Sequence, residues 1–131
     1  MMVGSVLAAE FLVSWDCIVF MNLKILSWNV RGLNDCRKRS IVKILLHEWK
    51  CDVICLQETK LIGLDRQMVS SLWSCPFVDW VALDAVQTAG GVLMMWDSRV
   101  LERLEFLVGS FSVSVWWQGV GDGFSWACSG V

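Results

Sequence analysis

The chain is poor in the residues that form zinc sites. Among its 131 residues there is one histidine, His47, and the six cysteines include no Cys-x-x-Cys pair. Zinc-binding motifs need such closely spaced pairs, so the pattern excludes this class of site. We expect reduced thiols packed as small apolar side chains, with Cys51, Val53 and Cys55 on one face of a strand. Reduced thiols are the default in a reducing, intracellular compartment.

Charged residues are also scarce, at 18% of the chain, and neither sign dominates. Lysine and arginine together number 11, and aspartate and glutamate number 13, which gives a net charge of −2 and a pI of about 5.3. This balance provides no overall basic footprint for nucleic acid.

Long uncharged apolar runs are missing too, even near the N-terminus. Residues 3–20 are mostly apolar, but Glu10 and Asp16 interrupt them. Two acidic groups argue against a membrane span, and we expect no membrane partner. The segment lacks the basic region that opens a secretory signal, so a signal peptide is the less favoured interpretation. We treat residues 1–20 as an apolar N-terminal extension that is not part of the domain.

A strand, a helix and a second strand are predicted in the first half of the chain. Residues 23–28 and 51–57 are apolar enough for buried strands, and Asn34 and Asp35 can cap the helix between them. We expect one face of this helix to be buried. The apolar residues that recur on it at helical spacing are Ile41, Ile44, Leu45 and Trp49.

This βαβ arrangement brings two polar side chains together. The crossover makes its strands parallel, so Asn29 and Glu58 both follow a strand at the carboxyl edge of the sheet, where open α/β sheets bind ligands. Glu58 comes after Gln57 at the end of an apolar run, residues 53–56. A carboxylate there needs a cation, a hydrogen-bond partner or water beside it.

The rest of the chain predicts a short helix and an antiparallel meander. The helix covers residues 65–73, and strands are expected over residues 77–83, 92–96, 100–108 and 110–117. Trp116 and Trp117 are interpreted as core or edge aromatics. Alternation predicts one shared face for Val100, Glu102, Leu104, Phe106 and Val108, and another for Phe111, Val113 and Val115. No internal repeat or linker is visible, so we assign one domain.

Two ordered motifs carry a family resemblance. Residues 28–33 (Trp-Asn-Val-Arg-Gly-Leu) and 56–60 (Leu-Gln-Glu-Thr-Lys) resemble the start of the endonuclease/exonuclease/phosphatase superfamily. Residues 31–34 (Arg-Gly-Leu-Asn) and 89–96 (Ala-Gly-Gly-Val-Leu-Met-Met-Trp) resemble the endonuclease domain of plant LINE-type (non-LTR) retrotransposons. The resemblance implies an α/β (α+β) fold over residues 21–131. This would be a partial two-sheet sandwich, roughly the first half of the family domain.

The resemblance also implies a metal-dependent phosphodiesterase site that acts on DNA, in the nucleus if the chain is functional. Asn29 and Glu58 would be its catalytic pair and the ligands of Mg²⁺ or Mn²⁺, which suits oxygen donors. Lys60 would be the nearby cation. Gly90 and Gly91 would form a loop beside the substrate, where missing side chains allow close backbone approach.

Arg31 is a local departure from the family pattern. Related repair nucleases often have an aspartate there, and Arg31 instead could contact a phosphate. It belongs to a group of cations that are close in sequence, Arg31, Arg37, Lys38, Arg39 and Lys60. We favour a solvated first helical turn for residues 37–39 over a contact with nucleic acid.

Two later motifs of the family are missing from this sequence. One is Gly-Asp-x-Asn, which supplies a base, and residues 121–123 (Gly-Asp-Gly) do not match it. The other is Ser-Asp-His, and His47 occurs too early and in a predicted helix surface. We therefore expect a truncated domain that is inactive alone. The alternatives are a non-catalytic retroelement relic and a fragment of a related phosphatase.

Composition agrees with a truncated domain. Hydrophobic residues make up 56% of the chain, the mean hydropathy is +0.55, and there are nine tryptophans. This is apolar for a soluble chain of one-domain length. A chain that supplies only part of a two-sheet sandwich would have an exposed apolar face and an open last strand. The alternative is a compact but unusually apolar domain.

Overall fold

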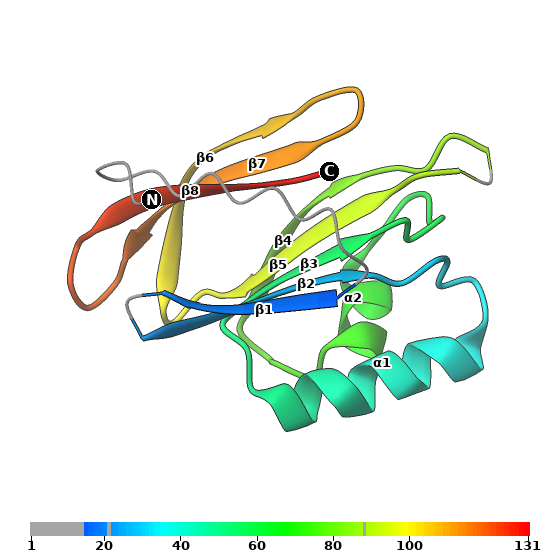
Figure 1. The fold of residues 1–131 in the computed structure, drawn as a ribbon, viewed down its shortest axis with the longest axis horizontal. Helices are drawn as coiled ribbons and strands as arrows, with labels where there is room; N and C mark the ends of the chain where they lie inside the picture. Colours follow the sequence, from blue (N-terminus) through cyan, green and yellow to red (C-terminus); the bar gives the residue numbers. More distant parts are fainter. Residues whose placement is uncertain (1–14, 21, 88) are drawn as a thin grey trace.

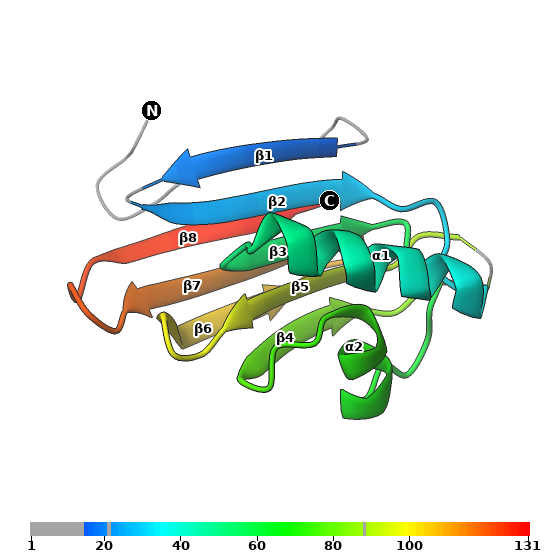
Figure 2. The same ribbon diagram turned by 90° about the horizontal axis from the view of Figure 1, so that it is seen from below.

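Two β-sheets and two helices form three layers in the computed structural model, which describes residues 15–20, 22–87 and 89–131 (Figure 1). Both helices cover one face of a five-stranded sheet, and a three-stranded sheet lies on its other face (Figures 1 and 2). The predicted two-sheet α/β sandwich is therefore confirmed.

The larger sheet contains the first five strands in the order β1-β2-β3-β5-β4. Strands β2 and β3 are parallel, as the βαβ prediction requires, and the other pairs are antiparallel. All five residues of β3 are buried, because neighbouring strands flank it and layers cover both of its faces. The strand bounds are Trp15–Phe20 (β1), Leu23–Asn29 (β2), Val53–Gln57 (β3), Val78–Leu83 (β4) and Val92–Asp97 (β5).

Part of the N-terminal extension forms strand β1 of the larger sheet. It pairs antiparallel with β2 at the edge of the larger sheet, while residues 1–14 lie outside the described residues. None of the helices in the described part of the chain has the length and apolar character needed to cross a bilayer.

Each helix begins at an aspartate that caps it. The Asp35 side chain accepts from the backbone N–H of Arg37 at the start of α1 (Cys36–Trp49). The Asp65 side chain accepts from Met68 at the start of α2 (Arg66–Leu72), 2.9 Å away. Such caps satisfy N–H groups that have no partner inside the helix. Both predicted helices are thus confirmed within a residue or two of their ends.

The predicted buried face of α1 is wrong in part. Ile41 and Ile44 are 56% and 62% exposed, while Val42 and Leu46 are fully buried. Two apolar stripes overlap in this sequence, and the buried one follows the spacing i, i+3, i+4, i+7 from Val42. His47 lies on the exposed surface of the helix, as predicted.

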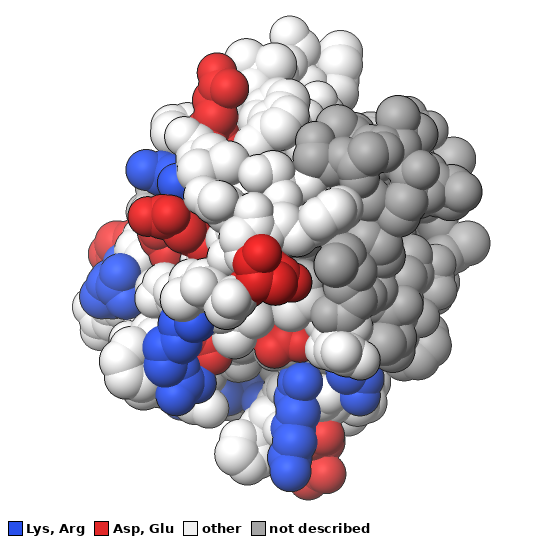
Figure 3. Space-filling view, turned by 90° about the vertical axis from the view of Figure 1, so that its left-hand side faces the viewer, with Lys and Arg blue, Asp and Glu red and all other residues white. Residues whose placement is uncertain are grey.

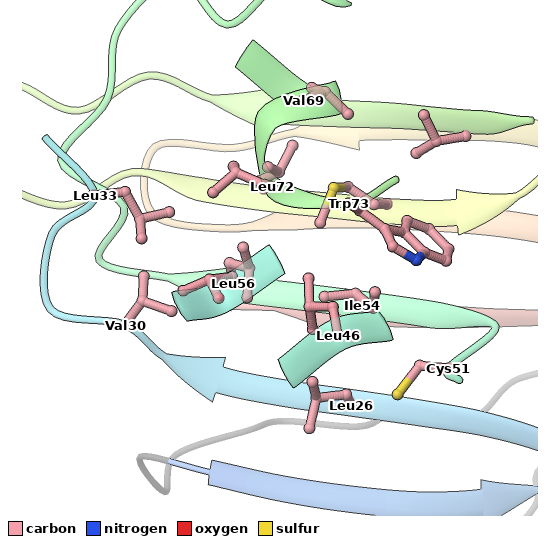
Figure 4. Packing of buried hydrophobic residues seen from close by; sticks show 14 of the residues in the cluster. Leu26, Val30, Leu33, Leu46, Cys51, Ile54, Leu56, Val69, Leu72 and Trp73 are labelled. Carbon is pink, nitrogen blue, oxygen red and sulfur yellow. The ribbon is translucent and has the colours of Figure 1, made fainter. Parts of the chain in front are cut away.

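The first core lies between the helices and the larger sheet (Figure 4). Leu26, Ile54 and Leu56 point from β2 and β3 toward Leu46 of α1. Full burial of one such side chain contributes roughly 1.5–3 kcal/mol. Cys51 belongs to this core and Cys55 does not, so the predicted shared face of the two cysteines is wrong. The reason is that β3 begins at Val53, beyond Cys51.

The smaller sheet is an antiparallel meander of three strands. Its strands β6 (Leu101–Val108), β7 (Val113–Gly119) and β8 (Ser125–Gly130) lie in sequence order. The predicted meander is confirmed for the strands at residues 100–108 and 110–117 and is wrong for those at residues 77–83 and 92–96, because these two belong to the larger sheet. The predicted common face of β6 is wrong, because a register shift between Arg103 and Glu105 interrupts the alternation. Phe111 precedes β7 and is 81% exposed, so only Val113 and Val115 of its predicted face are buried.

The second core fills the space between the two sheets. Trp117 is fully buried, and its ring centroid lies 5.5 Å from that of Trp96 and 4.7 Å from that of Trp126. Trp116 is half-buried, so the interpretation of this pair as core or edge aromatics is confirmed. Cys128 is buried there too, and burial raises the pKa of its thiol to about 12. The thiol is therefore neutral and packs as an apolar group.

Candidate functional site

Asn29 and Glu58 meet at the carboxyl edge of the larger sheet. Asn29 is paired with Gln57 across the parallel strands β2 and β3, and Glu58 follows directly. The Asn29 Nδ2 group donates a hydrogen bond to Glu58 Oε2. Asn29 Oδ1 accepts from the backbone N–H of Arg31, 3.1 Å away. Because that N–H can only donate, it fixes the amide with its NH₂ toward the carboxylate.

Backbone hydrogen bonds join three loops around this pair. The N–H of Gly32 donates to the carbonyl of Glu58 at 2.7 Å, so the loop after β2 is held against the loop after β3. The N–H of Lys60 donates to the carbonyl of Gly90 at 2.9 Å, and that of Thr59 to Gly91 at 3.1 Å. The structure thus brings Lys60, Gly90 and Gly91 beside Glu58.

The backbone of this edge is unusual. Arg31, Glu58 and Lys60 have φ values of 54°, 51° and 58°, in the left-handed region that residues other than glycine rarely adopt. Gly90 and Gly91 are left-handed as well, at 78° and 94°. Strained residues of this kind persist where the surrounding structure holds them, and they cluster at functional sites. The sequence signals this only through its glycines.

The cations of residues 37–39 hold the loop that carries Arg31. The Lys38 Nζ group donates to the Arg31 carbonyl at 3.3 Å, and the Arg39 guanidinium donates to the Leu33 carbonyl at 2.7 Å. Arg37 pairs with Asp35 at 3.0 Å, and this guanidinium lowers the pKa of the Asp35 carboxyl. The expected solvated turn therefore applies to Arg37 alone.

Arg31 and Lys60 are the cations that remain available at this edge. Neither side chain makes an ion pair with any residue in the described ranges, and Arg31 is exposed. The opposite end of the sheets has lysine and arginine beside aspartate and glutamate, with neither sign dominant (Figure 3). Local positive charge beside Glu58 is thus compatible with a chain whose net charge is −2.

An apolar groove of about 400 Å³ begins beside Glu58. Gly90 and Gly91 line it, together with Val86 and Phe111, which are 76% and 81% exposed. Sequence patterns do not predict this groove, because its lining residues come from segments far apart in the chain.

The corner offers few oxygen ligands, which suits a hard cation that keeps several of its waters. Glu58 offers a carboxylate, whereas Asn29 turns its NH₂ toward that carboxylate and its oxygen toward the Arg31 N–H. The described ranges contain no group of three or more histidine, cysteine, aspartate or glutamate side chains that could hold a metal ion. Mg²⁺ is commonly held by one or two carboxylates and keeps several waters. The residues therefore fit Mg²⁺ or Mn²⁺ better than a metal that needs a closed protein cage.

Comparison with known proteins identifies one family and one fold. The model of the "Endonuclease/Exonuclease/phosphatase family" matches residues 26–125. The chain is also similar to the crystal structure of an AP endonuclease, LMAP, from Leishmania major, with a TM-score of 0.57 and 20% sequence identity. This match covers 82% of the present chain and 39% of that chain, so the present chain spans well under half of its length. No curated protein matches.

Proposed function

Because the chain belongs to the endonuclease/exonuclease/phosphatase family over residues 26–125, we propose that it carries the metal-binding corner of a phosphodiester-hydrolysing domain. The hydrogen bond between Asn29 and Glu58, at the shared end of two parallel strands, is the observation that supports this proposal.

Each residue at the corner has a role in this proposal. Glu58 is the carboxylate ligand of Mg²⁺ or Mn²⁺, and Asn29 orients that carboxylate and faces the phosphate. When bound, the metal polarises the phosphate and stabilises charge on the leaving oxygen. Arg31 and Lys60 contact phosphate oxygens, which positions a nucleic acid without reading its sequence.

The loop of Gly90 and Gly91 completes the corner. Its carbonyls already accept hydrogen bonds from the residues after Glu58, so the loop lies beside the carboxylate. The absence of side chains there leaves room for the substrate backbone to approach.

DNA is the proposed substrate, and an endonuclease of a plant LINE-type retrotransposon is the proposed subfamily. The support for this finer assignment is the Arg-Gly-Leu-Asn and Ala-Gly-Gly motifs at residues 31–34 and 89–91. A phosphatase acting on smaller phosphates would use the same corner, so cleavage of DNA against release of phosphate from a small ester separates the two.

Metal binding tests the role of Glu58. Mg²⁺ should raise the midpoint of thermal unfolding of the 131-residue chain, because a ligand that binds only the folded state stabilises it. In Glu58→Gln this gain should disappear, and in Glu105→Gln, an identical change at an exposed site on β6, it should remain. Each titration is measured by calorimetry against NaCl at equal ionic strength. An equal gain in the wild type and Glu58→Gln would refute the assignment.

A further inference from the structure

Thr59 lies between two of the strained residues of the corner. Glu58 and Lys60, on either side, have left-handed backbones, whereas the side chain of Thr59 is fully buried. The exposed carboxylate is thus directly attached to a buried residue. Any movement of Thr59 changes the direction in which Glu58 leaves the strand.

The backbone of Thr59 binds two other segments, and its hydroxyl binds within its own loop. Its N–H donates to the Gly91 carbonyl at 3.1 Å, and its carbonyl accepts from the Leu33 N–H at 2.8 Å. Its hydroxyl Oγ1 accepts from the N–H of Leu61 at 3.3 Å. Thr59 is therefore a residue that binds both the loop after β2 and the glycine loop.

Gly91 fits this arrangement because it has no side chain. A Cβ atom at this position would collide with Thr59 Oγ1 and would lie 3.1 Å from the Lys60 nitrogen. The φ value of 94° is also one that other residues rarely adopt. The buried hydroxyl and the glycine thus pack directly against each other.

We propose that Thr59 is a positioning residue, whose buried hydroxyl, packed against Gly91, holds the left-handed backbone at Glu58 and so keeps the carboxylate on Asn29. The inference rests on the proposed function, since a positioned carboxylate matters to activity only if the corner binds metal. Left-handed residues other than glycine are costly and persist only where surrounding contacts hold them. Without the hydroxyl, the Leu61 N–H loses its acceptor and the constraint on Glu58 weakens.

The test uses a matched pair, Thr59→Ser and Thr59→Ala. Both lose the methyl group, and only the serine keeps the hydroxyl. The readout is the side-chain NH₂ signal of Asn29 in the ¹⁵N-labelled 131-residue chain, with Glu58→Gln marking the position of this signal when the carboxylate is lost. Thr59→Ala should move the signal toward that of Glu58→Gln, and Thr59→Ser should leave it at the wild-type position. A wild-type signal in Thr59→Ala would overturn the proposal.

A general loss of stability must be separated from loss of positioning. Leu46→Ala, in the core on the helix side, lowers stability without touching the corner, so its Asn29 signal should stay unchanged. If Leu46→Ala shifts the signal as far as Thr59→Ala does, the effect is global and the proposal fails. Should Thr59→Ala not fold, Gly91→Ala crowds the same hydroxyl and should shift the signal. Gly63→Ala, left-handed but with no atom within 4 Å of the new Cβ, should not. An unshifted signal in Gly91→Ala would overturn the proposal.

Titration with Mn²⁺ alone distinguishes the proposed metal binding at the corner from the proposed positioning of Glu58 by Thr59. If both proposals hold, Thr59→Ala weakens Mn²⁺ binding by about 10- to 100-fold, as loss of a group supporting a ligand does, while Thr59→Ser stays near the wild type. If the wild type shows no Mn²⁺ binding but Thr59→Ala still shifts Asn29, the proposed function fails and the positioning of Glu58 by Thr59 is retained. Equal Mn²⁺ affinities of Thr59→Ala and the wild type would overturn the positioning role.

Discussion

Asp97 is the one carboxylate with a buried side chain in the described ranges, and Arg99 holds it at the end of β5. The residue is 8% exposed, and its carboxylate accepts from the Arg99 backbone N–H and from the guanidinium at 2.7 and 3.1 Å. These hydrogen bonds from Arg99 lower the pKa of Asp97. A lowered folded-state pKa means that the ionised form stabilises the fold.

This contact predicts a pH-dependent loss of stability. Asp97→Ala should lower the free energy of unfolding at pH 7 by roughly 1–2 kcal/mol, less than a fully buried charged pair because Arg99 is largely exposed. The stabilising effect is complete above the unfolded-state pKa of about 3.9 and disappears as the pH falls through the lower folded-state pKa. Urea unfolding at several pH values measures it, with Glu105→Ala as the control. A difference between wild type and Asp97→Ala that grows below pH 4 would contradict the prediction.

At the residue scale, the sequence predicts which side chains lie at the ends of the strands, but it does not predict the contacts that hold those side chains in place. Asn29 and Glu58 could be placed together because parallel strands end at the same edge. The role of Thr59 could not be predicted, because its backbone binds Leu33 and Gly91, which lie in two loops distant in the sequence. Periodicity describes regular elements, and a left-handed residue between them leaves no periodic trace.

At the scale of elements, α1 shows how two apolar stripes compete. Ile41 and Ile44 continue a helical pattern that faces solvent, and Val42 and Leu46 continue the pattern that faces the sheet. Only the position of α1 over β2 and β3 selects between them. Spacing alone therefore predicted the helix correctly and its buried face only in part.

Two alanine substitutions test the orientation of α1. Leu46→Ala should lower the free energy of unfolding by roughly 2–5 kcal/mol, because it opens a cavity in a filled core. Ile44→Ala should change it by less than about 0.5 kcal/mol, since the side chain is mostly exposed and alanine favours a helix. Denaturant unfolding of both variants under one set of conditions gives the comparison. Similar losses for the two would mean that the helix is rotated relative to this structure.

The β6 strand shows a second limit of periodic patterns. Its sequence alternates, yet the register shift between Arg103 and Glu105 places Arg103, Phe106 and Val108 opposite the inward residues of β7. A bulge adds one residue to one strand, so the alternation beyond it changes face. Such a shift depends on the partner strand and not on the alternating sequence itself.

At the scale of the whole molecule, the apolar composition is only partly explained by the two cores. Leu104, Phe106 and Leu107 on β6 are 52%, 46% and 61% exposed. β6 and β8 each have β7 as their one partner strand in the described ranges. The sequence-based expectation of an exposed apolar face and an open last strand agrees with this arrangement.

The proposed corner does not by itself predict catalysis by the 131-residue chain. With Mg²⁺ present, this chain alone should not nick supercoiled DNA, because its sequence lacks the Gly-Asp-x-Asn and Ser-Asp-His motifs. Gel conversion of supercoiled to open-circular DNA measures nicking. The same chain extended by the later half of a family domain should gain the activity. Robust cleavage by the 131-residue chain, abolished in Glu58→Gln, would show that the missing motifs are dispensable.

The polypeptide passes from the larger sheet to the smaller one only once in the described ranges, through residues 98–100. No strand of one sheet is threaded between strands of the other, and the ladder of the smaller sheet is made within residues 101–130. The C-terminal meander is therefore covalently joined to the other layer at a single crossing. Its loss would leave every strand pair around Asn29 and Glu58 intact and would expose Trp96 and Met94 to water. The pairing that positions the corner is thus independent of the smaller sheet, whereas the burial of the core between the sheets depends on it.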